Sequence, residues 1–420
     1  MTDAPTRIAA PPAILAGGAP AAVLAALPGS RAVGGAVRDV LAGREVHDID
    51  IAAPFAPEEM AQRLKAARLK VFETGLAHGT LTAVLDHQPV EVTSLRRDLT
   101  TDGRHAEVAW TTDWREDAAR RDFTINAMSM AADGRLWDYF GGEADLAAGQ
   151  VRFVGEPATR LAEDYLRALR FFRFQARYGR GEPDPAALAA IAAAVPGLAR
   201  LSVERIWMEL KRLLEAPDPS AAVLLMETTG VLHAVLPECH RPAVLLALLR
   251  IGAPVDPLLR FDALVGSRSI RAARRLKASG EELQLLAQTN APLPGFDASD
   301  DELRRALVLH GRQRLLDFSW LDQAASLVAA ADPDYFSHPG PGQQPLAQPA
   351  LPARFRARVA EMPVPVFPLL GRDGLAAGIP PGPELGRLLA ATRAWWLEQG
   401  CTPDHAACLA MLKTLAAAPR

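Results

Sequence analysis

The stretch VGGAVRDVLAGREVHDIDIAA at residues 33–53 carries the strongest structural signal in the chain. Near its end are Asp48 and Asp50, and in a β-strand two aspartates one residue apart point to the same face of the sheet. Two carboxylates aimed at one point repel each other unless a cation lies between them. Mg²⁺ is commonly held by one or two carboxylates together with substrate phosphates. The pair therefore predicts a Mg²⁺ site with Asp48 and Asp50 as ligands; a solvated pair beside a turn is the simpler alternative.

The same stretch begins with Gly34 and Gly35, which follow a short run at residues 31–33. Glycines at the start of a helix let backbone N–H groups approach a phosphate. A phosphate-binding turn followed by a metal-binding aspartate pair is typical of phosphoryl or nucleotidyl transfer.

The composition limits the class of protein. The 420-residue chain is 49% hydrophobic and 23% charged, which is typical of globular proteins and long enough for about two to four domains. We expect no membrane span, since no run of about 18 apolar residues occurs. We also expect neither a signal peptide nor a framework of disulfide bonds or zinc-binding cysteines. We therefore expect a cytoplasmic protein, with no protein partner implied. The net charge of −3 requires any nucleic-acid surface to be local.

Strand-like and helical patterns divide the chain unequally. Short β-like runs alternate with helical stretches up to about residue 140, whereas strand signals vanish after residue 158. This pattern predicts an α+β fold with a mixed head and a long all-helical remainder. The expected strands lie at residues 31–33, 48–52, 69–72, 79–85, 90–95 and 136–139, and a helix is expected at 58–65.

Glu91, in the β-like run PVEVTSLRRD, adds a possible third carboxylate. Transfer reactions that use two metal ions about 3.5–4 Å apart need such additional carboxylates. The simpler alternative is a glutamate on the solvent face of a strand.

Two adjacent arginines, Arg120 and Arg121, precede Asp122, and Asn126 follows four residues later. Arginines offer planar donors for a triphosphate, and an aspartate can accept hydrogen bonds from ribose hydroxyls. The alternative is a charged helix N-terminus.

The segment EDYLRALRFFR at residues 163–173 predicts a helix on which Glu163, Arg167 and Arg170 share one face, flanked by Asp164 and Arg173. Arginine donors beside an aspartate acceptor can match the hydrogen-bonding edge of cytosine or adenine. The simpler alternative is a helix stabilised by ion pairs between successive turns.

Together these segments resemble the bacterial-type (class II) CCA tRNA nucleotidyltransferase and poly(A) polymerase family. The matching segments, in chain order, are GGAVRD with DID; HGTLTAV with VEVTSLRRD and TDGRHAEV; RRDFTINAM; DYFGGEADL; EDYLRALRFFRF; and LSVERIWMELKRLL. The resemblance covers residues 31 to about 214, and a weaker similarity returns between residues 367 and 389.

The resemblance implies a polymerase-β-type nucleotidyltransferase head followed by an all-helical neck, body and tail. The expected parts are a loose lead-in at 1–30, the head at 31–140, the neck at 141–215, the body at 216–330 and the tail at 331–420 with a Pro-rich linker. Asp48 and Asp50 would hold Mg²⁺, and Asp48, Asp50 and Glu91 would be the catalytic carboxylates. The residues expected to bind the nucleotide are Gly34, Gly35, Arg38, Arg120, Arg121, Asp122, Asn126, Glu163, Asp164, Arg167, Arg170 and Arg173.

The family adds CCA to tRNA 3′ ends from CTP and ATP without a template, so the implied partners are a tRNA 3′ end and these two nucleotides. Residues 96–108 (RRDLTTDGRHAEV) resemble the family's flexible loop, which favours the CCA-adding branch. A poly(A) polymerase, or a partial enzyme that adds only CC or only A, is the nearest alternative. A silent RNA-binding protein would not need the three carboxylates, and a small-molecule nucleotidyltransferase would not need the long helical remainder.

A local basic cluster is the candidate tRNA-binding surface. Phosphate contacts from such a helix position an RNA without reading its sequence, whereas a merely solvated face is the alternative. The cluster consists of Arg268, Arg271, Arg274, Arg275 and Lys277.

Overall fold

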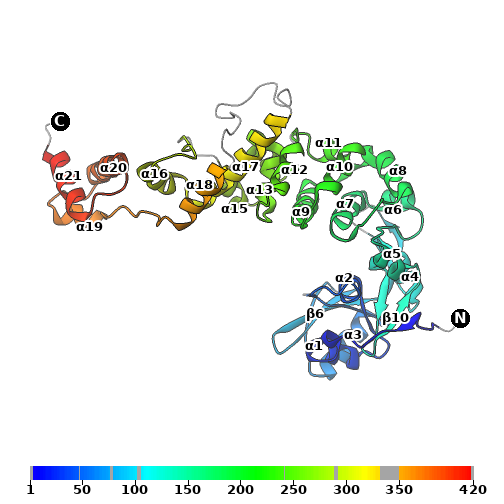
Figure 1. Ribbon diagram of the computed structural model, residues 1–420. Coiled ribbons are helices and arrows are strands. Elements are labelled where there is room, and N and C mark those ends of the chain that lie inside the picture. Colours follow the sequence, from blue (N-terminus) through cyan, green and yellow to red (C-terminus); the bar gives the residue numbers. More distant parts are fainter. Residues whose placement is uncertain are drawn as a thin grey trace. The chain divides into compact units, whose positions relative to one another are not determined.

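The computed structural model describes residues 3–46, 48–75, 79–101, 106–240, 242–287, 292–331 and 350–417 (Figure 1). The chain divides into two compact units, Met1–Cys239 and His240–Arg420. The first contains strands and helices, whereas the described residues of the second contain helices without strands. The expected α+β fold is therefore confirmed.

An eight-stranded sheet forms the centre of the first unit, with strand order β1-β10-β9-β2-β3-β6-β5-β4. Neighbouring strands are antiparallel except β3 and β6, which run parallel. A separate antiparallel ribbon is formed by β7 and β8. The strands are β1 (Arg7–Ile8), β2 (Arg31–Val33), β3 (Asp50–Ala53), β4 (Lys70–Gly75), β5 (Thr80–Leu85), β6 (Gln88–Ser94), β7 (Arg96–Thr101), β8 (Ala106–Trp110), β9 (Met128–Met130) and β10 (Arg135–Asp138).

Helices α1 (Gly18–Ala26) and α3 (Pro57–Ala66) cover one face of the sheet at β5 and β6. In β6, Val90, Val92 and Ser94 are buried, and the Ser94 hydroxyl lies 3.9 Å from the Met60 sulfur of α3. Since strand side chains alternate between faces, Glu91 must lie on the opposite face of the sheet. The apolar alternation of β6 thus directs this carboxylate away from the α1–α3 layer.

The remaining helices of the first unit follow the strand-rich part of the chain. Helix α2 contacts β2 and β9, and the helices after residue 156 pack on one another, with α7 against α9 and α10, and α6 against α8. Their bounds are α2 (Gly35–Leu41), α4 (Trp114–Ala119), α5 (Gly142–Ala148), α6 (Pro157–Glu163), α7 (Leu166–Tyr178), α8 (Pro185–Ala194), α9 (Val203–Leu214), α10 (Ser220–Thr228) and α11 (Val231–Val235).

The strand predictions are confirmed within one to three residues at each end, and so is the helix at 58–65. Strands β1, β7, β8 and β9 were not predicted. Two of them, β1 and β9, have only two and three residues, too few to show an alternating pattern. The first 30 residues, expected to be a loose lead-in, supply β1 at the edge of the sheet and α1 on its face.

The single helix predicted at residues 163–173 is wrong. Helix α6 ends at Glu163, Asp164 is extended (φ −155°, ψ 108°), and α7 begins at Leu166. The Asp164 carboxylate accepts a hydrogen bond from the Leu166 N–H at 3.0 Å, which satisfies a free donor in the first turn of α7. Asp164 is therefore held at a break between two helices rather than on a continuous helical face.

The second unit is a series of helices whose described residues include two apolar clusters. One cluster is built around Leu303, Leu315 and Phe355, and the other around Trp396 and Leu412. The helices are α12 (Pro242–Arg250), α13 (Pro257–Val265), α14 (Ser269–Arg275), α15 (Gly280–Leu286), α16 (Asp300–His310), α17 (Arg312–Ala331), α18 (Ala350–Glu361), α19 (Gly371–Ala376), α20 (Pro383–Glu398) and α21 (His405–Ala417).

Most of the expected Pro-rich linker, residues 332–349, lies outside the described residues. Within the described part of the chain, the structure contains no helix that is both long and apolar enough to span a membrane.

Candidate active site

A cavity of about 500 Å³ in the first unit brings together residues from the glycine turn, the aspartate strand, the arginine pair and the neck helices. All of the expected nucleotide-binding residues except Glu163 line it, together with Asp50. Three further residues were not predicted to take part: Leu166, Phe174 and Arg205. The lining residues are Gly34, Gly35, Arg38, Asp50, Arg120, Arg121, Asp122, Asn126, Asp164, Leu166, Arg167, Arg170, Arg173, Phe174 and Arg205.

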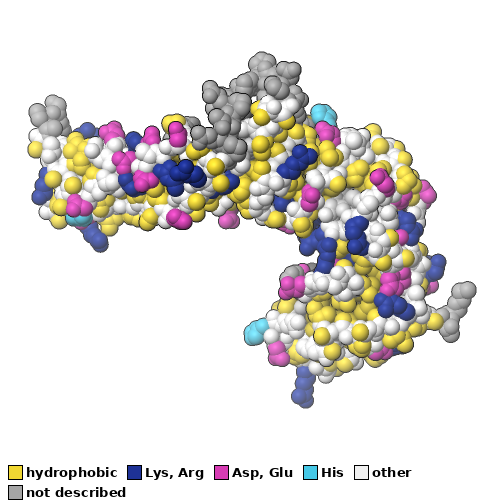
Figure 2. Space-filling model, viewed as in Figure 1, with side chains coloured by type: hydrophobic (Ala, Val, Ile, Leu, Met, Phe, Trp, Pro, Cys, Tyr) yellow, Lys and Arg dark blue, Asp and Glu magenta, His cyan; other side chains and the backbone are white. Residues whose placement is uncertain are grey.

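The charge of this cavity favours an anionic ligand. Seven arginines and three aspartates line it, a formal excess of four positive charges. Guanidinium groups are suited to phosphate oxygens because they donate hydrogen bonds in a planar, paired geometry. By contrast, basic and acidic side chains alternate over the visible face of the second unit (Figure 2), in keeping with the net charge of −3 for the whole chain.

The glycine turn lies next to two of the arginines. Gly34 has φ +65° and ψ −125°, a conformation that side-chain-bearing residues rarely adopt. A Cβ atom on Gly34 would lie 3.1 Å from Nη1 of Arg121, and one on Gly35 would lie 3.5 Å from Nη2 of Arg38. Glycine at position 34 therefore permits both the backbone turn and the approach of the Arg121 guanidinium.

The carboxylates meet at the parallel strand pair. Asp50 of β3 is the register partner of Glu91 of β6, so their side chains lie on the same face of the sheet. Burial raises the pKa of Asp50, and the Asp48 carboxylate adds to this rise while Arg121 opposes it. Burial and the Asp50 carboxylate raise the pKa of Glu91. Neighbouring carboxylates whose charges disfavour ionisation of Asp50 and Glu91 are a suitable donor set for a divalent cation, which would relieve the repulsion.

These carboxylates do not form a complete cage by themselves. Among the described residues, no group of three or more His, Cys, Asp and Glu side chains is close enough to hold a metal ion unaided. Asp48 is exposed and directly precedes β3 rather than lying within it. The donor set thus fits an ion that also takes ligands from a phosphate-bearing substrate, as Mg²⁺ commonly does.

A hydrogen-bonded chain joins α2 to α7 across the cavity wall. Arg38 donates to the Asn126 side-chain oxygen at 2.6 Å, and the Asn126 amide donates to Asp122 at 3.0 Å. Arg170 donates to the other oxygen of Asp122 at 2.7 Å, and the Phe123 N–H completes the set at 2.9 Å. Asp122 was expected to accept ribose hydroxyls, but the protein itself supplies donors to both of its oxygens. These contacts hold Asp122 against Arg170 and Asn126 at the wall of the cavity, and its contact with a ribose stays a prediction.

Glu209 of α9 contacts the arginines at the α7 end of this hydrogen-bonded network. Its buried carboxylate lies 2.8 Å from Nε of Arg173 and 3.8 Å from Nη1 of Arg170. Burial lowers the pKa of Arg173 to about 10, an effect that Glu209 opposes. The arginine therefore remains cationic at neutral pH while its charge is only partly solvated.

The residues expected to read a base are held by partners from three helices. Asp164 accepts from Arg205 of α9 at 2.6 Å, and Arg167 forms an ion pair with Glu163. Arg167 also donates to the backbone oxygen of Arg120 at 3.2 Å. Arg205 is in the segment LSVERIWMELKRLL, whose resemblance to the family was recognised, but only the fold brings it within reach of Asp164.

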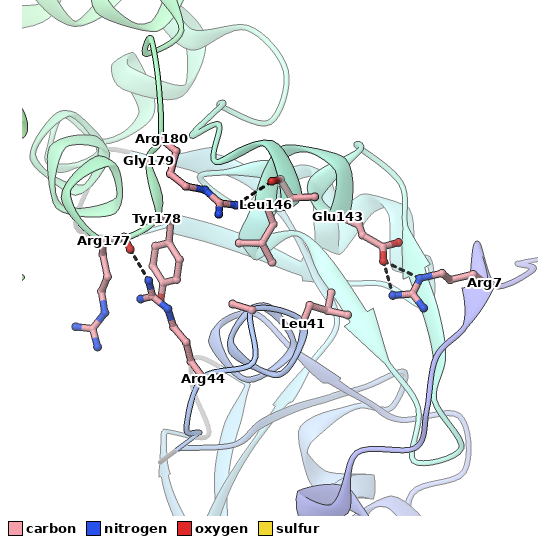
Figure 3. Close-up of a pocket in the computed structure, with 11 residues that line it drawn as sticks. Arg7, Leu41, Arg44, Glu143, Leu146, Arg177, Tyr178, Gly179 and Arg180 are labelled. Carbon is pink, nitrogen blue, oxygen red and sulfur yellow. Dashed lines mark hydrogen bonds and ion pairs between the residues drawn. The ribbon is translucent and has the colours of Figure 1, made fainter.

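A second cavity in the first unit, of about 390 Å³, is lined by Arg44, Tyr178 and Arg180 among others (Figure 3). In it, Arg44 donates to the backbone oxygen of Arg177 at 2.7 Å and its guanidinium lies 4.4 Å from the centre of the Tyr178 ring. The Tyr178 hydroxyl donates to Asp39 at 2.7 Å, and Asp39 accepts from Arg38. The two cavities therefore share a wall in which Tyr178 and Asp39 fix the orientation of Arg38.

The five residues of the expected tRNA-binding cluster lie in the second unit. They are all exposed and occupy α14 and the residues that flank it: Arg268, Arg271, Arg274, Arg275 and Lys277. Their arrangement on one short helix and its ends agrees with the sequence expectation; their binding of RNA stays a prediction.

The comparisons with known proteins agree on one family. Residues 30–152 match the family described as the poly A polymerase head domain, and residues 182–241 match a probable RNA- and SrmB-binding site of polymerase A. The mitochondrial CCA tRNA nucleotidyltransferase 1 of Mus musculus is 35% identical over 407 residues, covering 91% of this chain and 86% of that protein. The CCA-adding enzyme of Lacticaseibacillus paracasei is 33% identical over 377 residues, covering 85% of each chain.

A solved structure agrees with these relatives. The crystal structure of the Bacillus stearothermophilus CCA-adding enzyme in complex with CTP has a TM-score of 0.66 to this chain at 26% identity, covering 92% of this chain and 93% of that one. The arginine-lined cavity, the adjacent carboxylates and the similarity over nearly the whole length lead to one assignment: the chain belongs to the CCA tRNA nucleotidyltransferase family.

Proposed function

We propose that this protein adds CCA to the 3′ end of tRNA, transferring CMP and AMP from CTP and ATP and releasing pyrophosphate. The observation that carries the proposal is the cavity whose seven arginines surround Asp50 beside the glycine turn. The relatives and the solved structure are named as CCA-adding enzymes, and that structure contains CTP. An anionic nucleotide matches the positive charge of the cavity, and the carboxylates lie at its edge.

The triphosphate would bind between the glycine turn and the arginine pair. Arg121 lies beside Gly34 and also acts electrostatically on Asp50, so it can contact a phosphate close to the carboxylates. Arg38, held by Asn126 and Asp39, would contribute from the start of α2. The tRNA 3′-hydroxyl would attack the α-phosphate in line, and pyrophosphate would leave toward the arginines.

Nucleotidyl transfer generally uses a divalent metal ion, and we propose that here it is Mg²⁺, with Asp48 and Asp50 as ligands and Glu91 as the third carboxylate. When bound, the ion would lower the pKa of the attacking hydroxyl and stabilise charge on the leaving group. The raised pKa values of Asp50 and Glu91 support this site, because a cation between them would offset their repulsion.

Base selection would rest on Asp164 and Arg167. Asp164 supplies only acceptors and Arg167 only donors. Cytosine and adenine both present an amino donor beside a ring-nitrogen acceptor, whereas uracil and guanine present the reverse order. Arg205 would hold the Asp164 carboxylate in place by its 2.6 Å contact.

The deciding experiment uses a tRNA that ends before CCA, incubated with CTP, ATP or both, and resolved on a gel. We expect two additions with CTP alone and a third when ATP is also present. A long A tail would establish a poly(A) polymerase instead, and a product that stops at CC or that accepts only A would establish a partial enzyme. No extension with any nucleotide would refute the proposal.

We propose the cytoplasm as the site of action. Relatives of this chain include mitochondrial enzymes. Imaging and cell fractionation of a tagged full-length chain test the assignment, and recovery of the protein in an organelle fraction would contradict it.

A further inference from the structure

Asp117 is a buried carboxylate to which sequence reasoning gave no role. It lies on α4, three residues before Arg120 and four before Arg121, the spacings that bring side chains together on a helix. Its side chain is 3% exposed. A charge this well buried needs partners, and the partners of Asp117 are both arginines of the active-site cavity.

The contacts of Asp117 divide its two oxygens between the arginines. Oδ1 accepts from Nε and Nη2 of Arg120 at 2.9 and 2.8 Å. Oδ2 accepts from Nη2 of Arg121 at 3.2 Å. Burial alone would raise the pKa of Asp117, but Arg121 and Arg120 outweigh burial and lower it. The carboxylate therefore stays charged and separates two neighbouring cations that would otherwise repel each other.

Each arginine has donors left for a ligand. A guanidinium carries five N–H donors, and Asp117 takes only part of each set. The side chains of Arg120 and Arg121 are 18% and 19% exposed, and both line the cavity. Besides its contact with Asp117, Arg121 donates through Nη1 to the backbone oxygen of Asn126 at 3.5 Å. The donors that remain on the two arginines are available to a ligand in the cavity that they line.

The end of α4 is fixed from a second direction. Arg160 donates to the Ala119 oxygen at 3.2 Å, and Arg167 donates to the Arg120 oxygen at 3.2 Å. These contacts satisfy carbonyl groups at the helix C-terminus, where positive charge is favourable. The backbone that carries the two arginines is thus held by the neck, and Asp117 is the carboxylate that both arginine side chains contact.

Arg121 has a competing acid nearby. Burial raises the pKa of Asp50, and the charge of Arg121 opposes this rise, so the two side chains interact electrostatically. An Arg121 side chain released from Asp117 would have this second carboxylate to bind. Asp117 also accepts from the backbone N–H of Arg96 at 3.3 Å, at the first residue of the β7–β8 ribbon. The same carboxylate thus connects the ribbon to the arginine pair.

We propose that Asp117 is a positioning residue for nucleotide binding, which holds Arg120 and Arg121 so that their remaining donors face the phosphates of CTP or ATP. This inference rests on the proposed function for the identity of the ligand. The residue acts through the two arginines and touches no substrate itself.

The test compares Asp117→Asn with Glu116→Gln, an acid-to-amide change one residue away on the same helix. Glu116 is bonded to Thr111 rather than to the arginine pair. Binding of CTP to the full-length chain is measured by calorimetry without tRNA, and KM values are measured for CTP, ATP and tRNA. In Asp117→Asn we expect the Kd for CTP and the KM values for CTP and ATP to rise about tenfold or more, while the KM for tRNA stays within twofold of wild type. In Glu116→Gln all of these values should stay within twofold of wild type. Unchanged nucleotide affinity, or equal loss for nucleotide and tRNA, would overturn the proposal.

Two further variants separate positioning from stability. Asp117→Glu keeps the charge but displaces it by one methylene, so CTP binding should weaken at least threefold and less than in Asp117→Asn. In an Arg120→Ala, Arg121→Ala background, Asp117→Asn should weaken binding further by less than twofold, because the groups it orients are gone. If Asp117→Asn fails to fold, Asp117→Glu decides, and wild-type affinity in that variant refutes the proposal. CTP binding is measured without tRNA, so the two proposals can fail separately. If Asp117→Asn weakens CTP binding but the wild-type protein does not add CCA to tRNA, only the proposed function is refuted.

Discussion

Asp50 and Glu91 are register partners across the parallel strand pair β3–β6. Burial and the Asp50 carboxylate raise the pKa of Glu91. A parallel pair requires a long connection between its strands, here supplied by α3 and the β4–β5 hairpin. That connection brings a carboxylate from PVEVTSL next to one from DIDIAA. The chemistry we propose depends on this pairing.

The first prediction concerns these carboxylates. Asp48→Ala or Asp50→Ala should abolish transfer of both CMP and AMP, because a cation at the site would lose a ligand. Single-turnover assays on tRNA ending before C and before A measure the effect. Retention of more than about a tenth of wild-type kcat, a loss below ~1.4 kcal/mol, would contradict the assignment. Asp133→Asn, an exposed aspartate paired with Arg135 at 2.8 Å, is the control and should remain active.

The second prediction concerns the loop at residues 98–104. Its replacement should reduce addition of the terminal A more than addition of CC, because the resemblance to the family implies that this segment takes part in the change from C to A. Residues 102–105 lie outside the described part of the chain, while residues 98–101 belong to β7. Primer-extension gels with CTP alone and with both nucleotides measure the two steps. Equal loss of all three additions would exclude a dedicated role in the switch.

The third prediction concerns base selection. Asp164→Ala should let UTP and GTP compete better, and Arg167→Ala should weaken CTP and ATP together. Arg205→Ala should resemble Asp164→Ala in a milder form, because it leaves the carboxylate but removes its 2.6 Å partner. Incorporation of each of the four nucleotides is measured on tRNA ending before C and before A. Unchanged discrimination in the Asp164 and Arg167 variants would place selection elsewhere.

The fourth prediction concerns pH and the stability of the second unit. Burial raises the pKa of Asp317 on α17 to about 6, Asp256 and Asp262 add to the rise, and Gln313 and Arg314 oppose it. An acid whose pKa is raised on folding contributes stability that is complete below its unfolded pKa and is lost as pH rises through about 6. The free energy of unfolding should therefore fall between pH 4 and pH 7, by at most about 3 kcal/mol.

Asp317→Asn removes this titration, so the variant should gain stability relative to wild type as pH rises. Urea unfolding of both chains at a series of pH values measures the difference. The exposed Asp297→Asn is the matched control and should follow wild type. A constant difference between Asp317→Asn and wild type from pH 4 to pH 8 would contradict the pKa assigned to this carboxyl.

Several features followed from the sequence because they depend on local pattern. The alternation in residues 90–95 gives the buried face of β6, the glycines at 34 and 35 give the turn before α2, and Pro57 gives the start of α3. Residue types were equally informative: arginines and carboxylates at these spacings indicated an anionic ligand and a cation. The family could be recognised for the same reason, since its segments occur in order along the chain.

Other features arise only when distant segments pack together. The residues 163–173 read as one helix because their charge spacing is helical, yet the Asp164 carboxylate caps α7 and breaks the helix. Asp122 appeared free to bind ribose, but folding places Arg170 and Asn126 on it. Arg205 and Glu209 carried no local signal, because their partners are more than 30 residues away in the chain. Sequence thus determined which chemical groups are present and which local structures carry them. Tertiary structure decided which charges neutralise one another and which remain directed at the cavity. The reason is that the pairing of buried charges depends on distances through space, which spacing along the chain does not set.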